Sequence, residues 1–347
     1  MILLRILLFP FAIIYWLVTS IRNYLYDLGI LKSYSFNVPI IAVGNLSVGG
    51  TGKTPMIEYL IRLLSEQYAV ATLSRGYKRQ STGFILADDN ANAQTLGDEP
   101  FQIHQKFANI QVAVDANRKN GIEQLLSQNK KPQIILLDDA FQHRKVKAGF
   151  YILLTAYGDL FTDDWMLPTG NLRESRSGTK RADLIIVTKC PTNISETEQK
   201  EIRGKLERFL LRRNDSDSMV FFTSIAYDDS VYSADSVKKV SEIKTTSKLL
   251  LAGIAKPKPF FAYLQHVNDV VLTFPDHHDF SDSDIQIIKK QAENKLIITT
   301  EKDYVRLKNH IPASQLFYLP IKTKFVLEGN NFDQTILNYV GTSTANR

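Results

Sequence analysis

The sequence contains a single cysteine, Cys190, so no disulfide can form within the chain. It has no arginine-rich arm and no interleaving of basic with aromatic residues, and a net charge of +6 is too small to indicate nucleic-acid binding by itself. Hydrophobic residues make up 44% of the chain, which argues against disorder. We therefore expect a folded protein in a reducing compartment, with no nucleic-acid partner and with a positive surplus that suits an anionic ligand or membrane.

A full membrane-crossing run is also absent. The most apolar stretch, residues 6–21, spans about 24 Å as a helix, against roughly 30 Å of bilayer core. Arg5 and Arg22 flank it, and Pro10 removes one helical hydrogen bond. We predict that residues 1–32 form a membrane-associated helix that lies in one leaflet. A cleaved signal peptide, a buried core helix and a single span remain as alternatives.

From residue 38 onward, short apolar runs alternate with helical patterns. The expected strands are residues 39–43, 69–73, 110–114, 134–137, 151–155 and 184–187, and helices between them include 56–66 and 117–128. Continuous apolar strands separated by helices predict an α/β fold with a mainly parallel sheet that is covered on both faces.

A second domain is predicted after the polar stretch 214–218. We expect a core domain at residues 33–216 and a smaller α/β domain at residues 217–347, with strands at 220–224, 249–252, 270–274 and 296–299. The last residues, GTSTANR, indicate a frayed end.

The strongest local signal is IIAVGNLSVGGTGKTP, residues 40–55. An apolar strand, a glycine-rich turn and a Lys-Thr pair that opens a helix are typical of a P-loop NTPase, in which backbone N–H groups and a helix N-terminus surround phosphate. Lys53 is expected to reach the β and γ phosphates of ATP and the Thr54 hydroxyl to bind Mg²⁺. The predicted ATP-binding residues are Ser47, Val48, Gly49, Gly50, Thr51, Gly52, Lys53 and Thr54. Ser47 stands where the usual pattern has its first glycine.

A metal carboxylate is predicted where an apolar run ends in Asp138 and Asp139. We expect Asp138 to bind Mg²⁺, directly or through water. GTPases read guanine with a carboxylate in the pattern [NT]KxD, but the corresponding segment, TKCP, has Pro191 in its last position. The sequence therefore favours ATP over GTP.

Four further polar segments leave more than one interpretation open. In TLGDEP, Asp98 either caps a helix or acts as a base towards an acceptor hydroxyl. FPDHHDF, residues 274–280, is a polar turn, a metal site or a partner of the base. VDANR, residues 114–118, and LPTGNLRES, residues 167–175, are either solvated loops or contacts to an anionic substrate.

Taken together, these segments resemble the tetraacyldisaccharide 4'-kinase family of lipid A biosynthesis. The resemblance covers nearly the whole chain and rests on GNLSVGGTGKTP, LSRGY, GDEP, VDANR, LLDDAFQHR, LPTGNLRE, AGIAKPKPFF, FPDHHDF and TTEKDYV, in this order. It implies a peripheral or monotopic enzyme at the cytoplasmic face of a bacterial inner membrane. Such an enzyme uses Mg-ATP to phosphorylate the 4'-hydroxyl of an acylated glucosamine disaccharide 1-phosphate, giving lipid IVA.

The resemblance also implies roles for single residues. Asp98 matches the family's base and His277 its partner, while Lys53 would stabilise the transferring phosphoryl group. Five other residues match motif positions near the metal or the lipid head group: Arg118, Asp139, His143, Arg173 and Glu174. Asn171 departs from the family pattern, in which proline is common at this position.

Two other classes of protein compete with this interpretation. A membrane-associated NTPase switch or targeting ATPase shares the P-loop, but the missing guanine-reading carboxylate and the second domain argue against it. A soluble small-molecule kinase is disfavoured by the apolar N-terminus.

Overall fold

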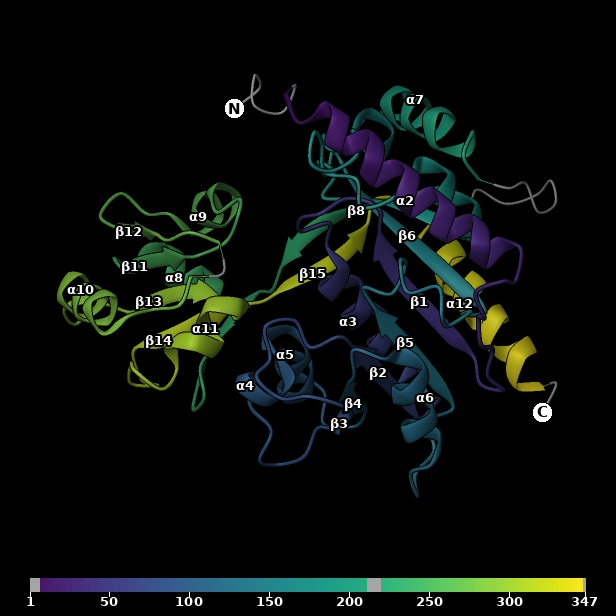
Figure 1. The fold of residues 1–347 in the computed structure, drawn as a ribbon. Coiled ribbons are helices and arrows are strands. Elements are labelled where there is room, and N and C mark those ends of the chain that lie inside the picture. The colour runs from purple at the N-terminus through teal and green to yellow at the C-terminus, as the bar shows by residue number, and fades with distance from the viewer. Residues whose placement is uncertain (1–6, 211–219, 277, 346–347) are drawn as a thin grey trace. The chain divides into compact units, whose positions relative to one another are not determined.

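The chain divides into two compact units (Figure 1). The structure, a computed structural model, describes residues 7–210, 220–276 and 278–345. Unit 1 comprises Met1–Ile225 and Thr323–Arg347, and unit 2 comprises Ala226–Lys322. The sequence-based division at residue 217 has no returning segment, whereas here the chain re-enters unit 1 at Thr323.

Unit 1 is built on a nine-stranded sheet in the order β15-β8-β7-β6-β1-β5-β2-β4-β3. The strands are β1 (Ile40–Asn45), β2 (Val70–Ser74), β3 (Ile85–Leu86), β4 (Gln111–Val114), β5 (Ile134–Asp138), β6 (Phe150–Ala156), β7 (Leu184–Thr188), β8 (Val220–Tyr227) and β15 (Ile321–Phe325). Pairing from β8 through to β4 is parallel, and only β3 is antiparallel to its partner among the registered pairs. The predicted mainly parallel α/β sheet is confirmed.

Helices cover both faces of this sheet, because alternate residues of each strand point to opposite sides. On one face, Ile41 and Val43 pack in a cluster with α3 (Lys53–Leu64), α5 (Asp98–Lys106) and α12 (Gly329–Ala345). On the other face, the cores contain residues of α6 (Arg118–Leu126) and α7 (Glu196–Glu207). A short helix, α4 (Ala93–Leu96), and two 3₁₀ turns, η1 (Phe161–Asp163) and η2 (Arg176–Arg181), complete the unit.

The expected frayed end is instead helical as far as Ala345, and residues 346–347 lie outside the described residues. Helix α12 runs through GTSTA to Ala345, although glycine and threonine are poor helix formers. Phe332, Ile336 and Val340 lie four residues apart on one face of α12 and are all fully buried. Burying such a side chain contributes about 1.5–3 kcal/mol, so packing outweighs the weak local propensity.

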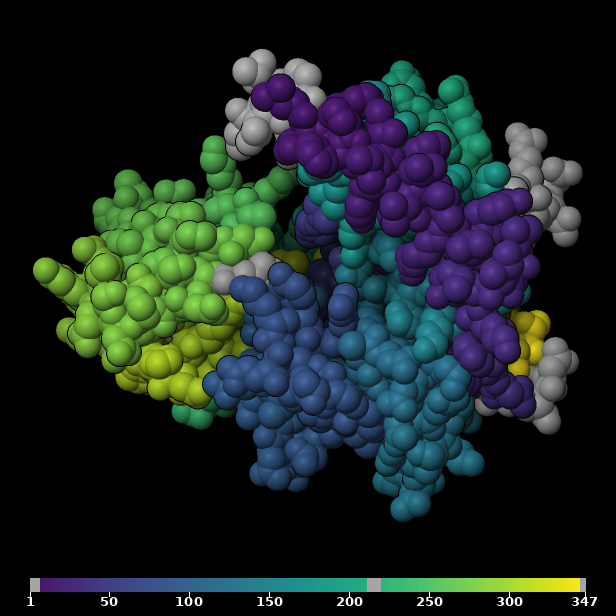
Figure 2. Space-filling model, viewed as in Figure 1, coloured from purple at the N-terminus to yellow at the C-terminus, as the bar shows by residue number. Residues whose placement is uncertain are grey.

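The N-terminal helix α2 (Phe9–Asp27) lies on the surface of unit 1, where its purple atoms are visible in Figure 2. It lies within the predicted range 1–32 and continues six residues beyond the apolar run that ends at residue 21. Pro10 stands in its first turn, where the missing N–H costs nothing. Ala12 is its one buried residue among those described. Within the described parts of the chain, no helix combines the length and the apolar character needed to span a bilayer.

Unit 2 is a smaller α/β unit with a six-stranded sheet in the order β10-β9-β14-β13-β11-β12. Its strands are β9 (Ser230–Tyr232), β10 (Val237–Lys239), β11 (Leu249–Ala252), β12 (Val270–Thr273), β13 (Ile297–Thr300) and β14 (Leu316–Leu319). Its helices are α8 (Val240–Thr245), α9 (Lys258–Leu264), α10 (Asp282–Ala292) and α11 (Glu301–Leu307). The four strands from β14 to β12 are parallel.

Candidate active site

The candidate site lies at the carboxyl edge of the unit 1 sheet, around the end of β1. The chain leaves β1 towards β2 on one side of it, and β5 leads to β6 on the other side. In open α/β sheets, ligands bind at the carboxyl edge where the strand order reverses in this way. Because β5 pairs directly with β1, with Val43 opposite Asp138, the predicted metal carboxylate lies beside the glycine-rich loop.

The loop between β1 and α3 has the backbone that its glycines predict. Gly49 has a φ of 110° and Gly52 a φ of 85°, a left-handed region that disfavours side chains with a Cβ. Val48, Gly49 and Gly50 are exposed, whereas Thr51 is buried. Gly52 is the N-cap of α3 and has no side chain to occupy the helix N-terminus. The first turn of α3 therefore keeps its N–H groups available for an anion.

Lys53 opens α3 and shares a carboxylate with Arg173. Its Nζ lies 3.6 Å from Asp139 Oδ1 and 3.5 Å from the side-chain oxygen of Asn45. Arg173 donates from Nη2 to Asp139 Oδ1 at 2.8 Å and from Nη1 to Oδ2 at 3.2 Å. Burial raises the pKa of Asp139, but the Arg173 hydrogen bonds and the Lys53 charge outweigh it and lower that pKa to about 2. Asp139 is therefore a fixed anion between two cations.

The neighbouring carboxyl group of Asp138 is in the opposite situation. It is 5% exposed, and its Oδ1 has no hydrogen-bond partner among the described residues. Burial, together with the negative charge of Glu99, raises its pKa to about 7 in spite of Lys53. A buried acidic oxygen without a partner is costly unless a ligand completes its surroundings.

Two neighbouring segments, around residues 188–189 and at residue 171, hold the loop in place. The Thr188 hydroxyl donates to the Thr51 carbonyl at 2.8 Å, and Lys189 Nζ donates to the carbonyl of Gly50. On the other side, Val48 N–H donates to the Asn171 carbonyl at 2.8 Å. The Thr-Lys pair at the end of an apolar strand is the sequence signal for the first of these contacts, and its position beside the loop bears on loop geometry as well as on nucleotide choice.

Asp98 is the first residue of α5, and Gly97 rather than Asp98 occupies the N-cap position. A Cβ on Gly97 would lie 2.9 Å from the Tyr77 carbonyl oxygen, so this close approach requires glycine. Glu99, the next residue, is near enough to raise the pKa of Asp138. The start of α5 thus belongs to the same edge of the sheet as the phosphate loop.

Two of the five candidate head-group residues point into the protein. Arg118 is 2% exposed and donates from Nη1 to the Asp115 carbonyl at 2.9 Å and from Nη2 to the Asp138 carbonyl at 3.2 Å, and burial lowers its pKa to about 10. Glu174 is 3% exposed and pairs with Arg181 at 2.8 Å.

The other three head-group candidates, Asp139, His143 and Arg173, lie nearer the surface. His143 is partly buried and has an Nε2 without a hydrogen-bond partner among the described residues. Burial and the Arg118 charge lower its pKa to about 4, so its ring is neutral at pH 7.

The histidine pair of the second unit is only partly described. His277, the expected partner of Asp98, lies outside the described residues. His278 lies 3.0 Å through Nε2 from Asp284 Oδ2 at the start of α10, and its ring stacks on Phe274 at 5.0 Å. The second histidine therefore makes contacts within unit 2.

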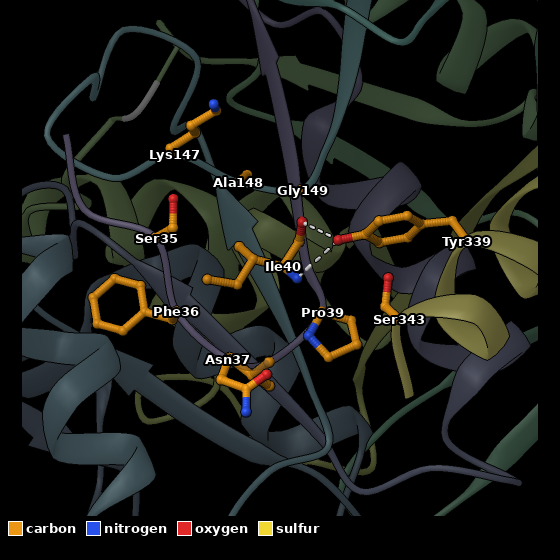
Figure 3. Close-up of a pocket in the computed structure, with 11 residues that line it drawn as sticks. Ser35, Phe36, Asn37, Pro39, Ile40, Lys147, Ala148, Gly149, Tyr339 and Ser343 are labelled. Atoms are coloured by element: carbon orange, nitrogen blue, oxygen red, sulfur yellow. Dashed lines mark hydrogen bonds between the residues drawn. The ribbon is translucent and has the colours of Figure 1, made fainter. Parts of the chain in front are cut away.

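Two grooves of unit 1 are lined by residues outside the phosphate loop. One, of about 290 Å³, lies at the opposite edge of the sheet, where Tyr339 and Lys147 flank the start of β1 (Figure 3). The other, of about 450 Å³, runs between α2 and the segment before η2. Trp16, Trp165 and Phe209 give it an apolar wall, and Arg176 and Lys180 line it as well.

Comparison with known proteins gives full-length matches. The model of the family described as Tetraacyldisaccharide-1-P 4'-kinase matches residues 4–341. A tetraacyldisaccharide 4'-kinase from Flavobacterium johnsoniae is 66% identical over 338 residues, covering 97% of this chain and 98% of the relative. The protein of that name from Bacteroides thetaiotaomicron is 44% identical over 364 residues, covering 98% and 94%.

A solved structure is similar over the same length. The crystal structure of LpxK from Aquifex aeolicus in complex with ATP matches with a TM-score of 0.77 and 29% sequence identity. The match covers 97% of this chain and 99% of that one.

Proposed function

The chain belongs to the tetraacyldisaccharide-1-P 4'-kinase family, and we propose that it transfers the γ-phosphoryl group of ATP to the 4'-hydroxyl of a tetraacylated glucosamine disaccharide 1-phosphate, giving lipid IVA. The observation that carries this proposal is the position of Lys53. It opens α3 behind a glycine-rich loop, 3.6 Å from Asp139 and at the edge where Asp138 ends β5. A membrane-associated NTPase switch has no comparable support, because the relatives named above are kinases over their full length.

In this proposal the nucleotide's phosphates lie over residues 47–54. Backbone N–H groups of the exposed loop and of the first turn of α3 bind the phosphate oxygens. Lys53, whose ion pair with Asp139 is long at 3.6 Å, turns to the β and γ phosphates. Arg173 stays paired with Asp139 and keeps that carboxylate charged. The loop holds its shape because Lys189 and Thr188 bind its carbonyl groups.

The residues at this edge fit a divalent cation. Asp138 presents a buried oxygen without a hydrogen-bond partner in the described chain, and the Thr54 hydroxyl lies in the first turn of α3. Carboxylate and hydroxyl oxygens are the ligand types that Mg²⁺ takes in phosphoryl-transfer sites. We assign Asp138 and Thr54 as the residues that hold Mg²⁺, which supplies positive charge to the transferring phosphoryl group when bound.

Asp98 is the proposed base for the acceptor hydroxyl. Its support is the family motif and its place as first residue of α5, on the same edge as Asp138. A carboxylate here accepts the proton that leaves the sugar oxygen as the phosphorus–oxygen bond forms. The partner role expected for His277 stays a prediction.

The apolar side of α2 is the proposed contact with the membrane. Phe11, Ile14 and Val18 are each 59% exposed, and Ile21 is 50% exposed. These residues recur at helical spacing, and exposed apolar surface of this kind marks an interfacial helix. Trp165, 60% exposed and in edge contact with Phe9, extends the same surface.

The test is phosphate transfer from labelled ATP to the detergent-dispersed acylated disaccharide, with the position of the new phosphate mapped. We expect a product phosphorylated at the 4' position, and Lys53→Ala should abolish it. ATP turnover that does not depend on the acceptor would instead support the switch class. An Ile14→Ser/Val18→Ser variant should bind vesicles more weakly than the unmodified protein.

A further inference from the structure

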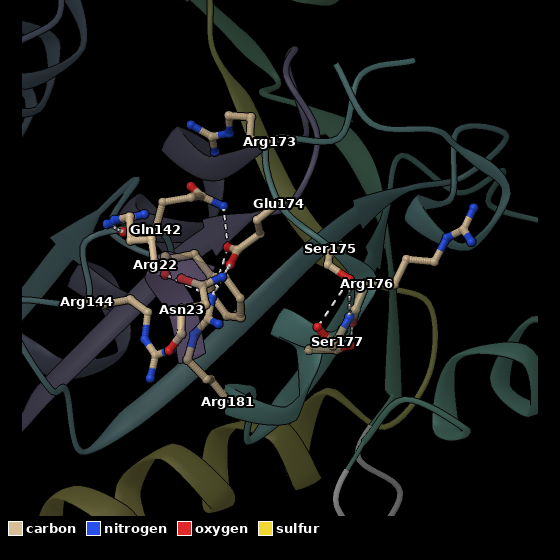
Figure 4. Close-up of polar contacts among 12 residues, drawn as sticks. Arg22, Asn23, Gln142, Arg144, Arg173, Glu174, Ser175, Arg176, Ser177 and Arg181 are labelled. Carbon is tan, nitrogen blue, oxygen red and sulfur yellow. Dashed lines mark hydrogen bonds and ion pairs between the residues drawn. The ribbon is translucent and has the colours of Figure 1, made fainter. Parts of the chain in front are cut away.

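The carboxylate of Glu174 is the centre of a buried polar network (Figure 4). Arg181 Nη2 donates to both of its oxygens at 2.8 Å, and Gln142 Nε2 donates to Oε1 at 2.8 Å. Asn23 of helix α2 donates from Nδ2 to Oε2 at 3.0 Å. With 3% exposure and these donors around it, Glu174 makes its contacts inside the protein rather than with a head group.

This network reaches the end of β1, where the phosphate loop begins. Gln142 Nε2 also donates to the Asn45 carbonyl at 2.8 Å, and Arg173 Nη2 donates to the same carbonyl at 3.2 Å. The Arg173 backbone N–H donates to the Leu46 carbonyl at 2.7 Å. The backbone of Arg173 is therefore bonded to Leu46, the first residue of the loop, while its guanidinium group holds Asp139.

Helix α2 holds the other side of the network. The Tyr15 hydroxyl donates to the Arg173 carbonyl at 3.0 Å, and Arg22 Nη2 donates to the Gln142 carbonyl at 2.8 Å. Tyr15 and Asn23 are eight residues apart, so they lie on one side of the helix. That side carries the polar contacts, whereas Ile14 and Val18 face outward.

Helix α2 has few fully buried apolar side chains, and polar contacts contribute strongly to its docking. Ala12 is the one buried residue of the helix among those described, and an alanine side chain contributes little apolar burial. Each neutral hydrogen bond contributes about 0.5–1.5 kcal/mol, and bonds to a charged group about twice that. Arg144 also holds the helix, through the Asn23 carbonyl and Asp27, but the Tyr15, Arg22 and Asn23 bonds are made to the segments that fix Arg173 and Asn45.

We propose that the polar side of α2 is a positioning element of the phosphate site. Tyr15 and Asn23 hold residues 173–174 in place. The Arg173 guanidinium group then keeps the side chains of Asp139 and Asn45 in position beside Lys53. Tyr15 and Asn23 are positioning residues because they act through Arg173 and Glu174. The inference rests on the proposed kinase function. It makes α2 a part of the catalytic structure as well as the membrane contact.

The experiment compares Tyr15→Phe and Tyr15→Phe/Asn23→Ala with Tyr24→Phe, a matched change on the same helix at a side chain that is 60% exposed. Turnover is measured on acceptor dispersed in detergent, so that vesicle binding does not enter. We expect kcat to fall about threefold in the single variant and about tenfold or more in the double variant, because small displacements of positioned groups cost turnover steeply. KM for the acceptor should change less than twofold, and Tyr24→Phe should behave like the unmodified enzyme.

Non-additivity separates positioning from general loosening of the fold. If Tyr15 acts through Arg173, Tyr15→Phe should have little further effect on kcat in an Arg173→Lys background. Equal effects of Tyr15→Phe in both backgrounds, or an unmodified kcat in the double variant, would overturn the proposal. If the unmodified enzyme transfers no phosphate at all, the proposed function fails. ATP affinity then decides the inference: weaker binding in the double variant but not in Tyr24→Phe supports it, and equal binding refutes it.

Discussion

The two ends of β1 differ in how the polar groups around them are paired. At the amino edge, Tyr339 Oη accepts the Ile40 N–H and donates to the Ile40 carbonyl, both at 3.3 Å. At the carboxyl edge, Asp138 Oδ1, Thr51 Oγ1 and His143 Nε2 are buried without a hydrogen-bond partner among the described residues. Folded proteins pair nearly all such groups, so three unpaired atoms at this edge mark a place where a ligand can supply the partners. The start of β1 is therefore tied to α12, and its carboxyl end is where we propose that the nucleotide binds.

The largest loss of activity is expected from Asp138→Asn. Turnover should fall by at least about 10³-fold, because the proposed Mg²⁺ loses its carboxylate. Stability should not fall with it. The folded-state pKa of about 7 lies above the ordinary 3.8, so the native state binds more protons than the unfolded chain between these values and loses stability as pH rises from 3.8 to 7. Denaturant unfolding at pH 8 without metal should show the variant as stable as the parent or more so.

Asp139→Asn, the same change at the adjacent residue, is the comparison variant for that experiment. Its carboxylate is stabilised by Arg173 and Lys53, and its pKa is lowered to about 2. Removing it should reduce stability at pH 8 as well as turnover. If both variants lose stability to the same extent, the contrast between the two carboxylates is wrong.

Asp98→Asn is expected to have the second largest effect on activity. A general base contributes about 10²–10⁴-fold to the rate, and it acts in the transition state rather than in substrate binding. We therefore expect kcat to fall in this range, while ATP affinity and the unfolding midpoint stay near those of the parent. Glu123→Gln, on α6 and 46% exposed, is the control. A raised KM with an unchanged kcat would remove Asp98 as the base.

The elements of the site could be predicted because their signals are local. A glycine-rich turn between an apolar strand and a Lys-Thr pair needs φ values that only glycine adopts easily, and Gly49 and Gly52 have them. An apolar run that ends in two aspartates gives the end of β5. In both cases, residues that are contiguous in the sequence were enough to predict the local structure.

The environment of each side chain could not be predicted in the same way. Asp138 and Asp139 are adjacent in the sequence, but one is buried without a partner and the other is held by Arg173. Arg118 and Glu174 matched motifs of a binding loop, yet both are buried in internal contacts made by residues distant in sequence. The return of α12 to unit 1 is also a long-range contact, which local helix propensity does not reveal.

Tyr339→Phe tests the amino end of β1, where the Tyr339 hydroxyl pairs both backbone groups of Ile40. Losing the hydroxyl leaves the Ile40 N–H and carbonyl without this partner, which should reduce the free energy of unfolding by about 0.5–1.5 kcal/mol. Turnover at a temperature well below the midpoint should not change. Tyr24→Phe, at an exposed position, should alter neither quantity. A loss of kcat in Tyr339→Phe would mean that the two edges are not separate in function.

The smallest expected effect is the pH dependence contributed by His143. Its folded-state pKa of about 4 lies below the ordinary 6.5, so between these values the unfolded chain binds more protons than the native protein. Stability is therefore lost as pH falls from 6.5 towards 4. His143→Gln should flatten this acid limb by roughly 1 kcal/mol at pH 5, after allowing for solvent screening of a partly exposed ring, and should leave stability at pH 8 nearly unchanged. Urea midpoints at pH 5 and pH 8, with His104→Gln as the control for loss of one titratable group, measure the difference. If His143→Gln loses as much stability between pH 8 and pH 5 as the parent, then keeping this ring neutral beside Arg118 does not destabilise the protein in acid.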